Sequence, residues 1–274
     1  MASLRLKPAF TLGLAPAIAV MAAALVICAS GLRGQNATQA TPSAQAPPRP
    51  VLVELFTSEG CSDCPPADEL LARLDQMQSI PGVQPIVLSE HVTYWNREGW
   101  HDPFSFDAID ERQHEYARQF TLNDVYTPQM VVDGTDQFVG NDAAKLIGAL
   151  THAATVTKLD LKIEDAHRAA DGSVDFSVQV PAGTKANLVA AVAESAATTQ
   201  VGRGENAGRT LHHVAVVRVL KDFGSKATDG RPLQLSGAGL SGAQPDGTPL
   251  RLVVFLVNHG NGHVVGAAEQ TLGQ

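Results

Sequence analysis

Cysteine and aromatic residues are scarce in this chain, and positive charge is in the minority. Three cysteines and two tryptophans occur among 274 residues, and Phe, Trp and Tyr together make up 5%. Residues 1–50 hold four basic and no acidic residues, so the rest of the chain carries 16 basic against 28 acidic residues, a net charge of −12. A body this acidic repels nucleic acid and anionic membrane surfaces, so we expect no nucleic-acid partner.

Common metal and phosphate motifs are also missing. A zinc site built from cysteine pairs needs a second pair, which the chain does not have. The glycine-rich stretch 202–208 has the wrong spacing for a phosphate-binding loop. His212 and His213 are adjacent, and adjacent side chains on a strand point to opposite faces. We therefore predict no metal site and no organic cofactor.

The first 30 residues are typical of a signal peptide. Arg5 and Lys7 precede an uncharged apolar stretch, residues 10–29. Because this stretch matches the ~20 residues of a membrane span, retention as an N-terminal membrane anchor is the alternative. Residues 31–50, rich in Pro, Ala, Gln and Thr, are typical of a linker. We predict an exported protein, periplasmic or secreted, that loses Cys28 with its signal.

The rest of the chain is organised around residues 51–66. Residues 51–56 are apolar and typical of a buried strand, 57–60 form a turn, and Cys61-Ser-Asp-Cys64 comes directly before a helical pattern over 67–77. The cysteines therefore lie at a helix N-terminus, where partial positive charge favours a thiolate. By this logic Cys61 is the more exposed, attacking thiol and Cys64 the resolving one. Glu59 and Asp63 oppose thiolate formation by their charge.

Further elements follow in a recognisable order. A second apolar strand covers 83–91, and Ser105 is placed to cap a helix over 106–120. Asp133-Gly134 is a hairpin signal that pairs 130–132 with 137–139, and 141–150 is again helical.

An aromatic segment, residues 93–102, lies between the second strand and this helix. It holds Tyr94, Trp95 and Trp100, which includes both tryptophans of the chain. We predict that these side chains line a substrate groove beside the cysteines. The alternative is that they pack a loop onto the core.

This order, βαβ then ββα with an inserted helix, resembles the thioredoxin fold. In that resemblance Thr127-Pro128 corresponds to the cis-proline beside the disulfide, where Pro128 shapes the groove and Thr127 contacts substrate. Glu54 resembles the buried carboxylate that accepts a proton from the resolving cysteine, with the spacing to Cys61 differing by one residue. The alternative for Glu54 is an edge-strand residue facing water.

More closely, the chain resembles a bacterial family of exported thioredoxin-like proteins of unknown function, domain-of-unknown-function family twelve twenty-three. The segments that carry the likeness are 53–68, 94–104, 125–134 and 204–212. The resemblance implies the fold and export but little about substrate.

The sequence pattern of the second half of the chain, residues 158–274, predicts a different architecture. Six short apolar runs, separated by turns, read as strands at 159–163, 174–180, 188–194, 212–220, 250–257 and 264–269. We therefore predict an α/β thioredoxin-like domain over 51–157 and a β-rich, sandwich-like C-terminal domain over 158–274. Arg203, Glu205, Asn206 and Arg209 form a polar loop that either meets the redox site or is solvated.

These features predict an exported thiol–disulfide oxidoreductase. Its substrate would be a disulfide-bearing protein or a small thiol, and it would need an electron-transfer partner that the sequence does not identify. Two alternatives stay open. One is a binding module with a structural disulfide, and the other is a copper(I)-binding protein that uses Cys61, Cys64 and His91.

Overall fold

The computed structural model describes residues 47–77, 80–240 and 247–273. The predicted signal or anchor and most of the linker lie outside the described residues. These described residues form one compact unit. Among the described helices, none is long and apolar enough to cross a membrane.

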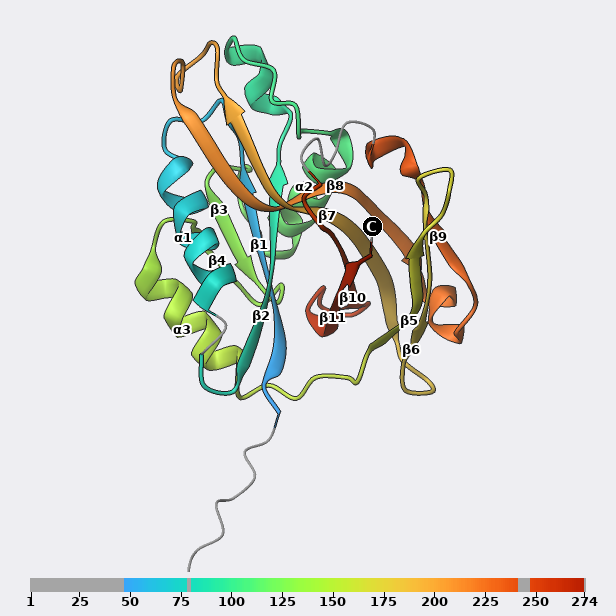
Figure 1. The fold of residues 1–274 in the computed structure, drawn as a ribbon. Helices are drawn as coiled ribbons and strands as arrows, with labels where there is room; N and C mark the ends of the chain where they lie inside the picture. Colours follow the sequence, from blue (N-terminus) through green and yellow to red (C-terminus); the bar gives the residue numbers. More distant parts are fainter. Residues whose placement is uncertain (1–46, 78–79, 241–246, 274) are drawn as a thin grey trace, which may run out of the picture. The chain divides into compact units, whose positions relative to one another are not determined.

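The fold is mixed α/β, with few helices and one large sheet that runs through both halves of the sequence. Its strand order is β11-β10-β7-β8-β2-β1-β3-β4 (Figure 1). The strands are β1 (Arg49–Thr57), β2 (Val83–His91), β3 (Gln129–Val132), β4 (Asp136–Val139), β7 (Ala186–Gln200), β8 (Thr210–Gly224), β10 (Leu250–Asn258) and β11 (Val264–Leu272). β2 runs parallel to β1 and β8, and the other neighbours are antiparallel.

Three helices cover the β1–β4 part of the sheet. They are α1 (Pro65–Met77), α2 (Asp107–Gln119) and α3 (Ala143–Ala153). Successive side chains of a strand point to opposite faces. On β1, Glu54 meets α2, whereas the next residue, Leu55, packs beside Ala67 of α1. Accordingly, α1 and α3 lie on one face and α2 on the other (Figure 1).

A second, smaller sheet packs on the C-terminal strands. It contains β5 (Lys162–Arg168), β6 (Val174–Gln179) and β9 (Leu233–Leu235), in the order β5-β6-β9. On β7, Leu188 and Ala190 join the core beneath this sheet, whereas Val189 and Ala191 join the core of the β1–β4 part. Burial on both faces explains why residues 188–193 of β7 and 252–257 of β10 are continuously apolar. The C-terminal half thus contributes side chains to both cores, and the two predicted domains share one sheet and the core of the β1–β4 part.

Several local predictions can be compared with the structure. The hairpin is confirmed, since Met130 pairs with Phe138 and Val131 with Gln137. The predicted cap at Ser105 is wrong, because α2 begins at Asp107 and its N-cap residue is Phe106. The Ser105 hydroxyl instead donates to the main-chain oxygen of Asp102 and stabilises the aromatic segment. β9 lies in a stretch that the sequence presents only as a glycine-rich connection.

Candidate functional site

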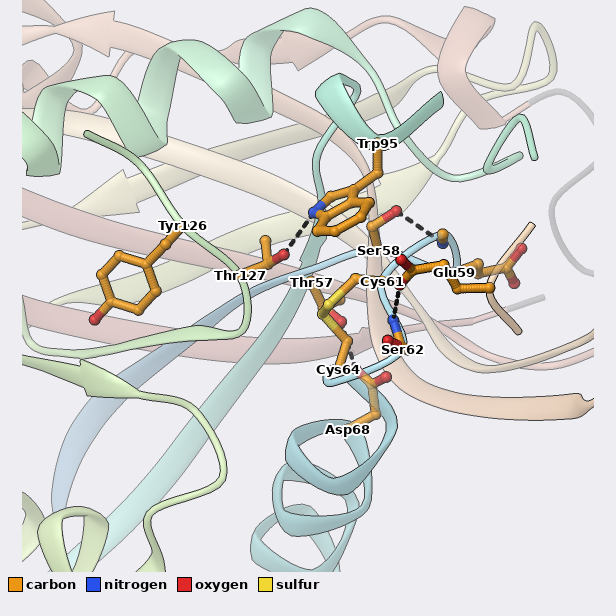
Figure 2. Close-up of a disulfide and its surroundings, with 12 residues drawn as sticks. Thr57, Ser58, Glu59, Cys61, Ser62, Cys64, Asp68, Trp95, Tyr126 and Thr127 are labelled. Atoms are coloured by element: carbon orange, nitrogen blue, oxygen red, sulfur yellow. Dashed lines mark hydrogen bonds between the residues drawn. A yellow bond between two sulfur atoms is a disulfide. The ribbon is translucent and has the colours of Figure 1, made fainter. Parts of the chain in front are cut away.

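Cys61 and Cys64 form a disulfide in the turn between β1 and α1 (Figure 2). Their Cα atoms are 5.4 Å apart. The Asp68 amide donates to the main-chain oxygen of Cys64, which makes Cys64 the residue that leads into the first helical turn. This is the position that the strand–turn–helix pattern predicts, and there the helix dipole favours a thiolate on the reduced pair.

Both cysteines are buried, so the disulfide form does not show the predicted difference in exposure between Cys61 and Cys64. The exposed fraction is 1% for Cys61 and 0% for Cys64. Three segments distant in sequence surround the turn: the aromatic segment, the loop before β3, and a loop between β7 and β8. A partner would reach either sulfur only after one of these segments moves.

The aromatic segment holds the turn through its two tryptophans. Trp95 Nε1 donates to Thr127 Oγ1 over 2.7 Å, which joins two of the predicted site segments (Figure 2). A Cβ on Gly60 would lie only 3.2 Å from the Trp95 Cβ, so the glycine allows this close approach. Trp100 Nε1 donates to Glu59 Oε2 over 2.8 Å.

The other predicted groove residues lie in the same region. The Thr127–Pro128 peptide bond is cis. A Cβ on Gly140 would lie 3.1 Å from both Pro128 and Ala67 of α1, which places Pro128 against the start of that helix. Tyr94 is half-buried, and burial raises the pKa of its hydroxyl.

The polar loop between β7 and β8, residues 201–209, meets the cysteine turn. Asn206 is fully buried, and its side-chain amide donates to the main-chain oxygens of Glu59 and Cys61, each over 2.9 Å. Glu205 Oε2 accepts from the Ser62 amide over 2.9 Å. Of the two possibilities for this loop, the one in which it meets the site is therefore the one observed.

Glu54 is fully buried on the central strand β1, so the alternative of an edge residue facing water is wrong. Its Oε1 accepts from Arg112 Nε over 2.8 Å, and its Oε2 accepts from Arg112 Nη2 over 3.2 Å. The Tyr116 hydroxyl also donates to Oε2. The carboxylate thus belongs to a buried ion pair with α2. A second buried acid, Glu90, lies nearby, and burial, with the adjacent Glu54 charge, raises its pKa well above the usual range.

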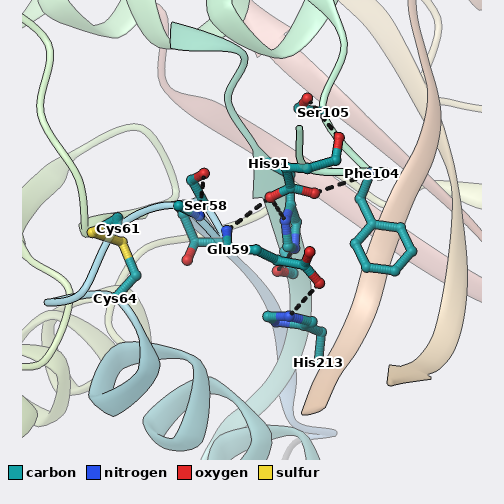
Figure 3. A network of polar contacts seen from close by, with 12 residues as sticks. Ser58, Glu59, Cys61, Cys64, His91, Phe104, Ser105 and His213 are labelled. Carbon is teal, nitrogen blue, oxygen red and sulfur yellow. Dashed lines mark hydrogen bonds and ion pairs between the residues drawn. A yellow bond between two sulfur atoms is a disulfide. The ribbon is translucent and has the colours of Figure 1, made fainter. Parts of the chain in front are cut away.

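A buried histidine lies between two carboxylates next to the cysteine turn. His213 Nε2 is 3.5 Å from Glu59 Oε1 (Figure 3). Its Nδ1 is 3.8 Å from Asp68 Oδ2. Burial opposes the charged ring, but Asp68 and Glu59 outweigh it and raise the pKa of His213 to about 10. The imidazolium therefore offsets the negative charge that Glu59 would otherwise place beside a thiolate.

His91 and Asp102 form a buried pair beside this group, with the His91 ring packed edge-to-face against His213. His91 Nδ1 is 2.8 Å from Asp102 Oδ2, and its Nε2 is 3.2 Å from Ser89 Oγ. The His91 and His213 ring centroids are 4.7 Å apart. Burial opposes ionisation of Asp102, but His91 and the amides of Glu59 and Phe104 hold its pKa below the usual value.

These contacts disfavour His91 as a copper(I) ligand, because both of its ring nitrogens already have partners. Among the described residues, no three His, Cys, Asp or Glu side chains are arranged to hold a metal ion.

Sequence reasoning missed Asp68, Asp102 and His213 as site residues, and it named Asn206 only as one member of the polar loop. The alternation of side chains along a strand could have identified His213. Leu211, His213 and Ala215 share one face of the strand, and all three are buried. No comparable local signal marks Asn206.

Comparisons with known proteins place the chain among uncharacterised relatives. The chain resembles the X-ray structure of protein AGR_C_4864 from Agrobacterium tumefaciens, with a TM-score of 0.58 and 28% identity over 82% of this chain and 94% of that one. HBP35 of Porphyromonas gingivalis shares the fold at a TM-score of 0.51 and 15% identity, over 82% of this chain and 76% of that one. No curated protein matches the sequence. Residues 52–256 match the family described as protein of unknown function (DUF1223), and the chain belongs to that family.

Proposed function

We propose that this protein is a thiol–disulfide oxidoreductase built on a thioredoxin-like arrangement of β1, α1, β2, β3, β4 and α3. The observation that carries the proposal is the Cys61–Cys64 disulfide at the N-terminus of α1. Low-pKa, exchange-active cysteines are typical of this Cys-x-x-Cys position. Trp95 and Thr127, in the two segments beside the turn, support it by offering an aromatic and a polar surface to a substrate.

The proposed reaction transfers two electrons from the cysteine pair to a substrate disulfide. The Cys61 thiolate attacks one substrate sulfur, forms a mixed disulfide, and releases the other sulfur as a thiolate that takes a proton from water. Cys64 then loses its proton and attacks Cys61 Sγ. This closes the Cys61–Cys64 disulfide and releases the second substrate thiolate. A dithiol partner restores the reduced pair by the reverse steps.

Access to the sulfurs requires a movement near the site. Three hydrogen bonds, two from Asn206 and one to Glu205, tie the 201–209 loop to the cysteine turn, and this loop is the segment we propose to shift when a substrate binds. The remaining expectations also stay proposals: export by the N-terminal segment, a protein or small-molecule disulfide as substrate, and a separate electron-transfer partner.

One observation favours a second candidate, a binding module in which the disulfide is structural. Both cysteines are buried to 1% exposure or less, and their turn is tied to the rest of the fold on three sides. Such a disulfide would stabilise the fold without exchanging.

The reduction potential of the pair distinguishes the two candidates. The protein would be equilibrated in dithiol buffers, and alkylated cysteines would be counted by mass. A potential between about −120 and −270 mV lies in the range of exchange catalysts, whereas one below about −300 mV indicates a structural disulfide.

An activity assay completes the test. Wild-type protein should accelerate the reduction of insulin by dithiothreitol, and Cys61→Ser should abolish the effect. Ser62→Ala is the matched control, since it changes an exposed side chain in the same turn and keeps both thiols. Equal activity of Cys61→Ser and wild type would contradict the proposed function.

A further inference from the structure

The resolving step of the proposed reaction needs a base for the Cys64 thiol. Glu54, the residue that the thioredoxin resemblance suggests, already accepts two hydrogen bonds from Arg112 and a third from Tyr116. Three lone-pair positions of this carboxylate are thus occupied, and its side chain meets α2, on the face of the sheet opposite α1 and the cysteine turn.

Asp68 is placed differently. It lies four residues after Cys64, and its amide donates to the Cys64 main-chain oxygen, so the two residues are stacked one turn apart on α1. Helical side chains at i and i+4 share a face, and each points back over the turn that precedes it. Asp68 is 5% exposed and Cys64 is 0% exposed, so both lie on the buried face. Figure 2 shows Asp68 projecting from α1 toward the cysteine turn.

Two side chains from other strands hold the Asp68 carboxylate. Thr57, at the end of β1, donates its hydroxyl to Asp68 Oδ1 over 2.9 Å. His213, on β8, lies 3.8 Å from Asp68 Oδ2. Among the described residues, the Asp68 carboxylate therefore has one short hydrogen bond and one longer contact with His213, whereas Glu54 accepts three hydrogen bonds. Asp68 thus keeps lone pairs that can accept a further hydrogen bond.

We propose that Asp68 is the group that takes the proton from Cys64 in the resolving step and returns it in the reverse step, with Thr57 and His213 as positioning residues. The inference rests on the proposed function. In the forward direction the Cys64 S–H bond breaks, its proton moves to Asp68, and the sulfur electron pair forms the bond to Cys61 Sγ. The bond from Cys61 to the substrate breaks, and the substrate sulfur leaves as a thiolate.

The charged groups around Asp68 determine what else its substitution changes. His213 faces it from β8, and Glu59 contacts the other ring nitrogen of His213. His91, paired with Asp102, packs edge-to-face against the His213 ring. Replacing Asp68 by Asn removes a negative charge near Cys64, which by electrostatics alone favours the thiolate. A purely electrostatic role thus predicts faster resolution, whereas a base role predicts slower resolution.

Reaction of the reduced full-length protein with an aromatic disulfide, 5,5′-dithiobis(2-nitrobenzoic acid), separates the steps. The first release of coloured thiolate reports attack by Cys61, and the second reports resolution by Cys64. In Asp68→Asn we expect an unchanged first phase and a second phase about a hundredfold slower near neutral pH, the lower end for general base catalysis. The deficit should vanish above about pH 8.5, where the thiol ionises unaided.

Matched variants keep the test decisive. Glu69→Gln, at the next position of α1 and exposed, should leave both phases unchanged. Thr57→Val, which removes the hydrogen-bond donor to Asp68, should slow the second phase by a smaller factor than Asp68→Asn. It also keeps the test possible if Asp68→Asn folds poorly. An unchanged or faster second phase in both Asp68→Asn and Thr57→Val would overturn the role of Asp68 and leave the proposed function standing. No reaction of wild-type protein would overturn both.

Discussion

The side-chain amide of Asn206 donates a hydrogen bond to the main-chain oxygen of Cys61, 145 residues earlier in the chain. The same amide group donates to the oxygen of Glu59, and Asn206 Oδ1 accepts from Arg209. One buried residue of the second half therefore fixes the turn that carries the proposed chemistry of the first half. Access to the disulfide and the stability of the 201–209 loop are coupled through this contact.

Asn206→Ala should loosen that contact. The buried Glu59 carbonyl would lose its Asn206 donor, whereas the Cys61 carbonyl would keep the amide of Cys64, and an unsatisfied buried polar group costs about 1–3 kcal/mol. We expect a lower free energy of unfolding in urea and a faster reduction of the Cys61–Cys64 disulfide by dithiothreitol. Arg203→Ala, an exposed position of the same loop, is the control. A variant reduced at the wild-type rate would show that the loop does not limit access.

The contrast between Asn206 and the cysteines shows what the sequence can predict here. The strand, turn and helix around Cys61 and Cys64 follow from signals within 30 residues: an apolar run, a glycine, two prolines and a helical repeat. The contact of Asn206 depends on how two distant segments meet, which no local pattern encodes. The sequence therefore predicted a polar loop at 201–209 but did not decide whether this loop meets the cysteine turn or is solvated.

Buried charges illustrate the same limit. A glutamate within the apolar run 51–56 indicates a carboxylate that needs a partner, but not which of the chain's cations provides it. Arg112 lies 58 residues away on a helix whose periodicity places it inward only once the packing is known. The two-domain prediction likewise followed the change of pattern near residue 157, whereas the pairing of Ser89 with Val216 joins the halves in one sheet.

Replacing Arg112 should be the most destabilising change in the β1–α2 contact. Arg112→Met leaves Glu54 as a buried carboxylate without its cation, which typically costs about 3–5 kcal/mol. The measurement is urea unfolding of Arg112→Met, Glu54→Gln and the double variant. The double variant should recover part of the loss, because it no longer buries an unpaired charge. Arg118→Met, exposed on the same helix, controls for helix propensity, and an equal loss in both arginine variants would contradict the argument.

Ionisation of buried Glu90 should lower the free energy of unfolding as the pH rises from acidic values. Burial raises its pKa in the folded state above the value of 4.5 for a free side chain, so the folded protein binds more protons than the unfolded one. The stabilising contribution is complete below pH 4.5 and is lost as pH rises through the folded pKa, at up to about 1.4 kcal/mol per pH unit. Glu90→Gln should remove this slope, whereas exposed Glu111→Gln should retain it. Parallel stability profiles of wild type and Glu90→Gln would contradict the prediction.

Deprotonation of His213 should lower the free energy of unfolding further, over a higher pH range. Its pKa is about 10 in the folded protein against 6.5 for a free side chain. A raised folded pKa means that the contribution is complete below pH 6.5 and is lost between pH 6.5 and about 10, again at up to about 1.4 kcal/mol per pH unit.

The variant His213→Gln tests this relation, with urea unfolding measured from pH 6 to pH 10. The stability gap between wild type and variant should be widest near pH 6 and should narrow steadily toward pH 10, because only the wild type loses an imidazolium between Glu59 and Asp68. His212→Gln, on the exposed face of the same strand, should follow the wild-type profile. A gap that stays constant over this range would mean that His213 is neutral when buried, and that Glu59 and Asp68 carry their charge beside the cysteines without a compensating cation.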